Sequence, residues 1–489
     1  MQLKTSETDF IVIGAGYGGV TSAGLLQNRG FNVKLLEAHS LIGGCASYFK
    51  RKNFLFDVGA TTFSGILSHQ PLGRLFRELN INPELIKIEP GMIIQMGSKK
   101  IIRYSNPNQW VNELNRHFPI QGIDRFWKRV FTLDRLSWEF ISQNQKIPPR
   151  NLMDVFSLLK FSNLNKVSLL PNIFRSVDSV LNSMNIYNQE FRKFLDEQLL
   201  ITTQSRADVA PMLTAAMGLA YPAETYYPMG GMYKPAELIL EKFKELGGEL
   251  ILKEKVIRIS QKNDGYEVET KKGITYFSKG IISNIPIWNL AEITEGNIQK
   301  YFLKKAKKYP EAPGAFTVNF AVESKVSLDS LYFQIHTRTK IPYCEAGAFF
   351  VSFSHLSDRN KSPEGFRTVT ISTHTNPNEW IGLSKENYNQ KKEITCKFIL
   401  SEFDYAFPEL SEANKIFPLA GTPDTFEYYT HRKNGFVGGI AHSVHSNLLL
   451  MTPNISPFQN FYLAGDTVFP GQGIPAVTLG ALNLVSQIP

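Results

Sequence analysis

The order of apolar and polar positions at the start of the chain predicts a strand, a helix and a second strand. Residues 10–13 form a continuous apolar run, which is typical of a strand buried on both faces. A helix-like stretch follows at residues 20–29 and stops at Gly30. A second apolar run at residues 33–36 ends in Glu37. This order predicts the opening unit of an α/β fold with a parallel sheet.

Three further stretches of the chain have patterns of their own. Residues 83–219 read mostly as amphipathic helices, because apolar residues recur three and four positions apart. Residues 247–288 predict a strand, a hairpin pair and a strand that ends at Ser283 and Asn284. Residues 313–373 alternate apolar and polar positions, as half-buried antiparallel strands do.

Composition narrows the class of protein. A chain of 489 residues with 43% hydrophobic and 20% charged residues is globular and long enough for two or three domains. The net charge of +9 forms no basic stripe with interleaved aromatic residues, so we expect no nucleic-acid partner. Three widely spaced cysteines argue against a disulfide framework and for a reducing compartment. The first ten residues have no apolar core of a signal peptide, so we expect a cytoplasmic protein.

The last stretch of the sequence has no charged residue after Asp466 and raises the question of a membrane anchor. Its first part holds Pro470, Gly471, Gly473 and Pro475, which do not suit a helix in hydrocarbon. The apolar helix that follows, residues 477–485, is too short to span a bilayer. We therefore expect this stretch to return to the first one instead.

The first turn carries the glycine spacing of a dinucleotide-binding loop. Gly14 permits a tight turn, Gly16 lets the backbone approach a pyrophosphate, and Gly19 allows close packing of helix on strand. The helix N-terminus adds partial positive charge. Glu37 lies 18 residues after Gly19, where a carboxylate accepts hydrogen bonds from an adenosine ribose. Strand, glycines, helix, strand and acid in this order predict a bound dinucleotide.

Two further segments give the motif a family resemblance. The paired glycines Gly43 and Gly44 are followed by "FDVGAT", and "LAGDTVFPGQGIPAVTLGAL" stands near the end. These segments resemble the flavin amine oxidase and phytoene desaturase superfamily, which implies FAD as the cofactor. In that superfamily the last βα unit reaches the flavin. The resemblance implies cofactor contacts by Gly14, Ala15, Gly16, Gly18, Gly19, Glu37, Ala38, Gly43, Gly44, Cys45, Val256, Gly465, Asp466, Gly473, Ile474, Pro475 and Ala476.

Within the superfamily the chain is most similar to the phytoene desaturase and carotenoid isomerase family, in particular to the carotenoid end-group (C-3′,4′) desaturases. Segments such as "PPRNLMDVF" and "YYPMGGMYKPAELI" extend the resemblance over nearly the whole sequence. Two departures stand out. Cys45 occupies a position where many members have an arginine that contacts the cofactor phosphates, a role that Lys50 or Arg51 would fill only in part. "DVGAT" replaces the "D-x-G-P-T" pattern of bacterial phytoene desaturases.

The resemblance implies an α/β fold, in which a Rossmann-like FAD-binding domain of the GR2 flavoprotein type carries an inserted α+β substrate domain. We expect residues 1–75, 226–290 and 450–489 to form the discontinuous FAD-binding domain. Residues 76–225 and 291–449 then form the substrate-binding domain.

The implied activity is that of an FAD-dependent oxidoreductase in carotenoid biosynthesis, acting on a hydrophobic polyene as a desaturase. A carotenoid cis–trans isomerase and a polyene reductase of the retinol saturase kind use the same parts. A flavin amine oxidase and a non-enzymatic lipid-binding module like the Rab GDP-dissociation inhibitors are more distant alternatives. The sequence identifies no catalytic residue. It holds no second dinucleotide fingerprint, so we expect an external electron acceptor, a quinone or oxygen.

Two other patterns bear on metal binding and on membrane contact. His442 and His445 lie three positions apart without a third ligand nearby, so no metal site is expected. The aromatic and basic residues at 123–142 suit an amphipathic core helix. The alternative is peripheral docking on the cytoplasmic membrane face, with Phe126, Trp127, Phe131, Trp138 and Phe140 at the interface.

Overall fold

The computed structural model describes residues 8–158, 161–324 and 326–489. Its centre is a five-stranded sheet in the order β19-β13-β1-β2-β9, in which every neighbouring pair is parallel. The strands are β1 (Phe10–Ile13), β2 (Val33–Glu37), β9 (Glu249–Leu252), β13 (Gly280–Ser283) and β19 (Phe461–Leu463). Stretches that lie far apart in the sequence therefore build one sheet, and the predicted Rossmann-like fold is confirmed.

The strands of this sheet are apolar throughout because both faces are covered. Phe10 and Val12 on one face of β1 join a core with α1 (Tyr17–Asn28), α2 (Pro71–Leu79), α10 (Lys234–Glu245) and α15 (Ile474–Ser486). Ile11 and Ile13 on the other face share a core with β10 (Val256–Lys262), β11 (Gly265–Thr270), α11 (Ile287–Ile293) and α12 (Gly296–Lys308). β12 (Thr275–Ser278) completes the antiparallel sheet of β10 and β11.

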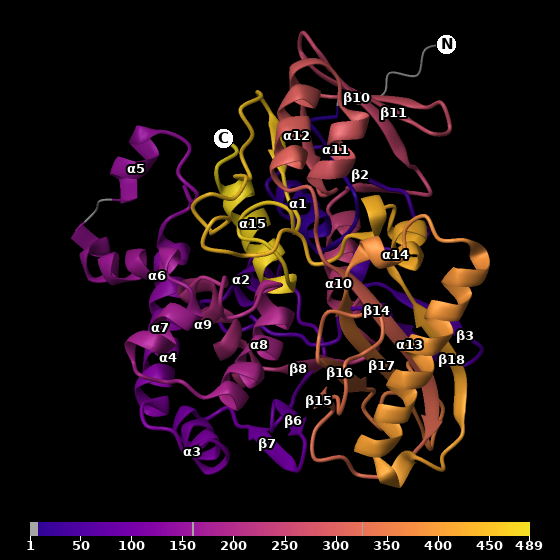
Figure 1. Cartoon of the computed structure of the whole chain (residues 1–489). Helices are drawn as coiled ribbons and strands as arrows, with labels where there is room; N and C mark the ends of the chain where they lie inside the picture. The colour runs from indigo at the N-terminus through magenta and orange to yellow at the C-terminus, as the bar shows by residue number, and fades with distance from the viewer. Residues whose placement is uncertain (1–7, 159–160, 325) are drawn as a thin grey trace.

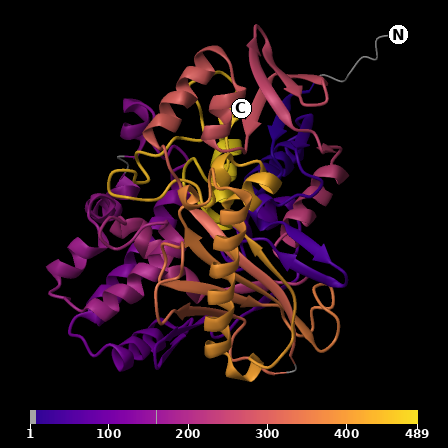
Figure 2. The ribbon, with the colours of Figure 1, turned by 45° about the vertical axis from the view of Figure 1, so that its right-hand side comes forward.

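A second sheet has seven strands in the order β18-β14-β17-β16-β15-β6-β7. They are β6 (Met92–Met96), β7 (Lys99–Arg103), β14 (Gly314–Glu323), β15 (Tyr332–His336), β16 (Ala348–Phe353), β17 (Phe366–Thr375) and β18 (Lys415–Gly421). All pairs are antiparallel except β15 with β6. The predicted antiparallel strands at 313–373 are confirmed. The long helix α13 (Lys385–Ala406) lies along this sheet, and the Phe320 and Phe403 rings meet at 5.1 Å (Figure 2).

A block of helices stands opposite the seven-stranded sheet. It consists of α3 (Pro107–His117), α4 (Ile123–Gln143), α5 (Leu152–Leu158), α6 (Leu170–Phe174), α7 (Val177–Ser183), α8 (Gln189–Thr203) and α9 (Met212–Ala220). The expectation of a mostly helical segment at 83–219 is wrong for its first part, which forms β5 (Leu85–Lys87), β6 and β7. β6 is apolar on both sides because it is buried in the core, so its pattern does not alternate.

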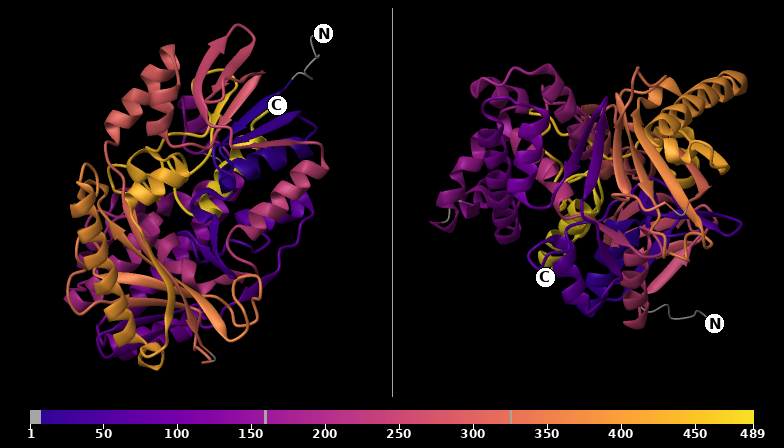
Figure 3. Two further views of the ribbon diagram at one scale, coloured as in Figure 1. Left: turned by 90° about the vertical axis from the view of Figure 1, so that its right-hand side faces the viewer. Right: turned by 90° about the horizontal axis from the view of Figure 1, so that it is seen from below.

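The helical block and the seven-stranded sheet flank the central region from two sides (Figure 1). Seen from below, the helical block and the seven-stranded sheet lie to the two sides of α15, and their buried apolar side chains share one core (Figure 3). The remaining elements are β3 (Tyr48–Arg51), β4 (Phe54–Asp57), β8 (Tyr226–Pro228) and α14 (Pro423–Thr430). Within the described ranges, no helix is long and apolar enough to cross a membrane.

Candidate cofactor and substrate site

A single cavity of about 1640 Å³ joins the parallel sheet to the space between the helical block and the seven-stranded sheet. Its wall begins at the β1–α1 turn and continues past β10 and the start of α15. It ends at α8, α9, β14 and β17. Pockets for one drug-sized ligand measure roughly 300–1,000 Å³. The volume therefore suits a dinucleotide and a second large molecule side by side.

The β1–α1 turn has the geometry that phosphate binding requires. Gly14 has a φ of +93°, and a Cβ at Gly19 would lie 1.9 Å from the Gly14 carbonyl oxygen. Gly16 caps α1 and lines the cavity, so the first amides of the helix face it without intervening side chains. Free amides and the helix dipole together form an anion site. The glycine spacing in the sequence thus becomes a phosphate cradle.

Glu37 lies where β2 ends and lines the cavity together with Ala38. Its Oε2 accepts a hydrogen bond from the Ala15 amide at 2.6 Å, and its Oε1 accepts one from the His39 amide at 2.7 Å. Burial raises the pKa of Glu37 despite these amides. The carboxylate therefore fixes the glycine loop, and its remaining lone pairs face the cavity opposite Val256.

The paired glycines pack directly on the glycine loop. The Gly43 amide donates to the Ala15 carbonyl at 2.9 Å, and both Gly43 and Gly44 have positive φ. Cys45 follows and lines the cavity. Burial raises the pKa of the Cys45 thiol, so it stays neutral and contributes no charge to the phosphates.

A buried cation near Cys45 is Arg432, which follows α14. Arg432 Nη2 donates to both carboxylate oxygens of Asp466, at 2.9 and 2.8 Å. Both residues line the cavity next to Gly465, and only 12% of the Arg432 side chain is exposed. Burial disfavours the charge on Arg432, but the Asp466 carboxylate outweighs it and raises the pKa of Arg432. Sequence reasoning missed Arg432, although it lies inside "THRKNGFVGG", a segment that carried the family resemblance.

The start of α15 completes the cradle. Gly473 caps the helix with a φ of +93°, and no side chain accepts from the first amides. Gly473, Ile474, Pro475 and Ala476 all line the cavity. A helix N-terminus aimed into a cavity stabilises negative charge there.

The residues present fit FAD. All seventeen predicted cofactor residues line the cavity except Ala15 and Gly19, which lie behind the loop and support it. A Cβ at Gly18 would lie 2.6 Å from Asn284 Oδ1 and 3.0 Å from the Gly465 amide nitrogen. The first and last βα units are therefore held in contact through a glycine. Glu37, the glycine loop, and Asp466 with α15 would hold the adenosine, pyrophosphate and flavin ends respectively.

Uncharged polar groups surround the flavin end of the cavity. Gln204 Nε2 donates to Gln472 Oε1 at 2.6 Å, and Gln472 Nε2 donates to the Ile201 carbonyl at 3.1 Å. Burial lowers the pKa of His442 to about 4, so the imidazole is neutral at pH 7. In the described part of the chain, no three His, Cys, Asp or Glu side chains could hold a metal ion.

The docking hypothesis for residues 123–142 is wrong, because α4 turns its aromatic face inward. Phe126 and Trp127 are 0% and 1% exposed, and their rings pack edge to face at 5.9 Å. Trp138 is partly buried and lines the cavity. The exposed apolar side chains of the helical block lie instead on α5 and α6 and just before α6.

Comparison with known proteins places the chain among flavoproteins. The family described as flavin containing amine oxidoreductase matches residues 17–487. A chloroplastic prolycopene isomerase of Daucus carota is 27% identical over 507 residues, which cover 99% of this chain and 80% of that one. A 4,4′-diapophytoene desaturase of Methylomonas is 24% identical, with 98% and 95% covered. An all-trans-retinol 13,14-reductase of Danio rerio is 23% identical, with 98% and 86% covered.

Solved structures show the same fold. An oxidoreductase from Methanosarcina mazei has a TM-score of 0.65 at 16% identity, covering 98% of this chain and 100% of that one. Putrescine oxidase bound to putrescine has a TM-score of 0.62 at 13% identity, with 98% of both chains covered.

Proposed function

Because the chain belongs to the family of flavin-containing amine oxidoreductases, we propose that it is an FAD-dependent oxidoreductase acting on a long polyene isoprenoid, as in carotenoid biosynthesis. One observation carries the proposal: the FAD cradle and a second chamber form one continuous cavity of about 1640 Å³. The chamber is large enough for a long, thin molecule to lie against the flavin. The names of the relatives, which refer to carotenoids and to retinol, support this substrate class.

We propose the same division of the chain as the sequence predicts. Residues 1–75, 226–290 and 450–489 hold FAD, and residues 76–225 and 291–449 enclose the substrate. The parallel sheet lies wholly in the first set, and the seven-stranded sheet lies wholly in the second.

Bound FAD supplies hydride transfer at its flavin ring. The start of α15 and Asp466 line the cavity where they would hold that ring, and the dipole of α15 would favour the negative charge of its reduced form. Gln204 and Gln472 face the chamber at this end as neutral hydrogen-bonding groups, and neutral His442 adds no charge.

Desaturation is the first candidate reaction, and cis–trans isomerisation is the second. The 27% identity to prolycopene isomerases favours cis–trans isomerisation. Pigment analysis of a carotenoid-producing host with and without this gene tests the proposal. Purified protein with FAD separates the two reactions: a desaturase consumes an electron acceptor such as a quinone or oxygen in proportion to product, and an isomerase consumes none. Flavin reduction by simple amines, with no change in any polyene, would contradict the proposal and favour an amine oxidase.

The proposal includes contact with a membrane, where long polyenes dissolve. Leu152 and Phe156 on α5 are 75% and 67% exposed, and Met153 beside them is equally open. Phe174 and Leu170 on α6 are also exposed. Exposed apolar side chains of this kind suit insertion into a bilayer. We call the exposed apolar side chains of α5 and α6 the apolar surface.

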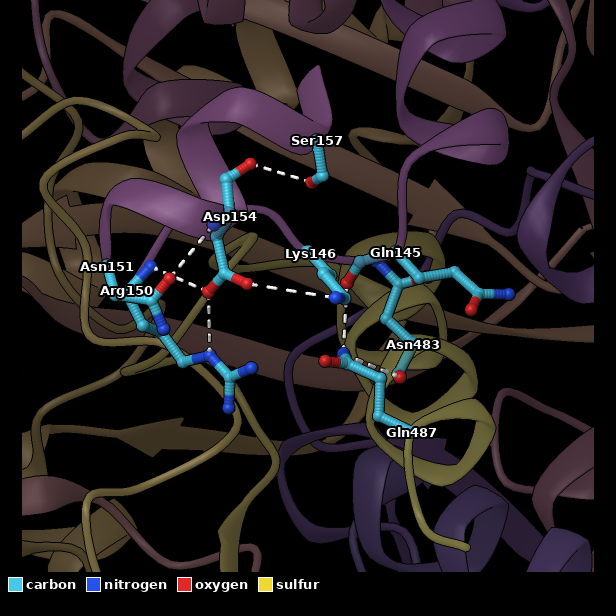
Figure 4. A network of polar contacts seen from close by, with 8 residues as sticks. All are labelled: Gln145, Lys146, Arg150, Asn151, Asp154, Ser157, Asn483 and Gln487. Carbon is cyan, nitrogen blue, oxygen red and sulfur yellow. Dashed lines mark hydrogen bonds and ion pairs between the residues drawn. The ribbon is translucent and has the colours of Figure 1, made fainter. Parts of the chain in front are cut away.

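The apolar surface is firmly attached to the rest of the protein (Figure 4). Buried Asp154 of α5 accepts from Arg150 Nε at 3.1 Å and lies 3.9 Å from Lys146 Nζ. Gln487 Nε2, just after α15, donates to the Gln145 carbonyl at 3.0 Å. The segment that leads into α5 is thus bonded to the end of the helix whose start would touch the flavin.

A small apolar cavity of about 30 Å³ lies between the apolar surface and the main cavity. Leu169 and Ile173 line it on the side of α6. Ile141 and Leu448 line both cavities. This arrangement supports a route by which an apolar substrate enters the chamber without crossing water.

A further inference from the structure

The main cavity reaches the surface between β3, α13 and α14. Lys50 and Arg51 on β3 are exposed, and both line the cavity. Tyr428 on α14, which is 73% exposed, and Lys392 on α13 line it as well. We call this opening the basic mouth and define it by Lys50, Arg51 and Lys392.

The cations of the basic mouth lack carboxylate partners. Among the residues that the structure describes, Lys50, Arg51 and Lys392 form no ion pair. Lys50 Nζ lies 5.9 Å from the centre of the Tyr48 ring. Lys392 Nζ lies 5.6 Å from the centre of the Tyr388 ring. Aromatic faces hold such cations without neutralising them, so the charge of the mouth is left to attract an anionic partner.

Neighbouring side chains leave an excess of positive charge at the mouth. Lys52, in the turn after β3, adds a cation that lies 5.3 Å from the centre of the Phe417 ring. Asp424 on α14 lines the cavity and lies close enough to interact with Lys392, although the two described side chains form no ion pair. Glu427 is exposed one turn further along α14. An excess of one sign of exposed charge steers the approach of an oppositely charged protein.

The basic mouth lies near the FAD cradle. Cys45 lines the cradle beside Gly43 and Gly44, and β3 begins three residues after it. Lys50 follows Cys45 by five residues, and an extended chain of that length spans at most about 18 Å. A partner seated at the mouth would therefore be close to bound FAD, as electron exchange between proteins requires.

The basic mouth and the apolar surface lie on opposite sides of the molecule. In Figure 1, α5 and α6 stand on the left, whereas β3 and α13 stand on the right. The view from below separates the same segments (Figure 3). A quinone dissolved in a membrane would come from the side of α5 and α6. A partner of the basic mouth would come from water.

We propose that an acidic, water-soluble electron-carrier protein docks on the basic mouth and exchanges electrons with the bound flavin. This inference rests on the proposed polyene activity and adds the electron partner, in place of a quinone or oxygen. The cations are spread over β3, the turn after it and α13. Such spacing suits the acidic face of a protein better than a single phosphate or carboxylate group. A small docking area is typical of transient complexes between redox proteins.

The electron balance sets how many carriers the reaction needs. Each new double bond releases two electrons and two protons from the polyene. The electrons leave through the flavin to two one-electron carriers, and the protons go to water. Isomerisation has no net electron flow, so carriers would only reduce the flavin once, with protons taken from water.

The test compares two one-electron acceptors of opposite charge: an acidic plastocyanin, which is a copper protein, and cytochrome c, a basic haem protein. Protein loaded with FAD is reduced with dithionite in the absence of oxygen and freed of excess reductant. Each oxidised carrier is then mixed with it in a stopped-flow spectrometer. At low salt we expect plastocyanin to reoxidise the flavin at least tenfold faster than cytochrome c does. About 0.5 M salt should remove most of this difference, because salt screens exposed charges.

Lys50→Glu with Lys392→Glu reverses the charge of the mouth. We expect this double variant to react at least tenfold more slowly with plastocyanin and faster with cytochrome c. Lys304→Glu with Lys307→Glu on α12 is the matched control, since it changes the net charge equally at two exposed lysines outside the mouth. The control should keep both rates close to those of the unaltered protein. Flavin absorbance is recorded for every variant.

Equal rates for the two carriers, or equal losses in the two double variants, would overturn the inference alone, since a quinone or oxygen could still serve the enzyme. Loss of FAD from Lys50→Glu with Lys392→Glu would assign these lysines to the cofactor and also overturn the inference. Protein that holds no FAD, or that acts on no polyene, would overturn the proposed function as well.

Discussion

Arg432 holds both carboxylate oxygens of Asp466, at 2.9 and 2.8 Å, across the wall of the FAD cradle. The two residues come from different parts of the fold, one after α14 and one after β19. Their ion pair fixes the orientation of Asp466 and brings a buried positive charge next to Cys45.

Asp466→Ala should lose FAD and also destabilise the fold. The substitution leaves Arg432 buried without its partner, which costs about 3–5 kcal/mol in comparable pairs. The double variant Arg432→Gln with Asp466→Ala removes both charges and should regain much of the lost stability without regaining FAD. Urea unfolding and flavin absorbance measure the two effects separately. Normal flavin content in the double variant would show that the pair is purely structural.

Glu37→Ala should weaken FAD binding by about 1.5–3 kcal/mol, the contribution of a hydrogen bond to a charged group. Glu37→Gln keeps one acceptor oxygen for the Ala15 or His39 amide and should lose less. Equilibrium titration of the apoprotein with FAD gives both values, and FMN serves as the control ligand because it has no adenosine. If Glu37→Ala weakened FMN binding equally, Glu37 would act by folding the glycine loop and not by binding the adenosine ribose.

Stability should fall with acid between pH 6.5 and pH 4. Burial lowers the pKa of His336 and of His442 to about 4, from 6.5 in the unfolded chain. Below pH 6.5 the unfolded state takes up protons that the folded state does not, so the free energy of unfolding decreases as the pH falls. Each imidazole contributes on the order of 1–3 kcal/mol at most. Urea unfolding at pH 7 and pH 5 measures the loss.

His336→Gln with His442→Gln should flatten this pH dependence. Exposed His69 offers a control, because His69→Gln removes an imidazole without removing a buried one. A dependence that stays equally steep in the double variant would assign the acid sensitivity to other groups.

Binding to vesicles should depend on the apolar surface. Met153→Asp with Phe156→Asp places charges where insertion is expected, so we expect at least a tenfold loss of binding to anionic vesicles in a sedimentation assay. High salt should weaken binding only in part, because apolar insertion persists when charges are screened. Phe277→Asp alters an equally exposed ring on β12, at 62%, and should have no effect. Equal losses in both variants would mean that the apolar surface is not the membrane contact.

The sequence predicted the FAD cradle well because its parts depend on local backbone geometry. A Cβ at Gly19 clashes with the Gly14 carbonyl oxygen whatever the rest of the chain does, so the motif can be recognised from spacing alone. Arg432 could not be assigned in this way. It lies in a loop 34 residues before Asp466, and its role depends on how that loop folds back.

The helix at 123–142 shows that residue types alone do not predict which face of a helix is buried. Its aromatic residues match both a core helix and an interfacial one, and only the packing of Trp127 against Trp110, at 5.3 Å, distinguishes them. The polar cavity face of β14 is a similar case. Alternation predicted the strand but not which side faces the ligand.

The topology of the parallel sheet has a consequence for biosynthesis. β1 lies between β2 and β13 in the middle of the sheet, and β19 pairs with β13 at its edge. A ribosome releases β1 hundreds of residues before β19 and α15, so the nascent chain exposes an apolar sheet edge for most of its synthesis. Stable uptake of FAD must wait until that edge is filled. Asp466 and the start of α15 are the last residues of the cradle to be synthesised, so the complete FAD cradle forms only once β19 has paired with β13.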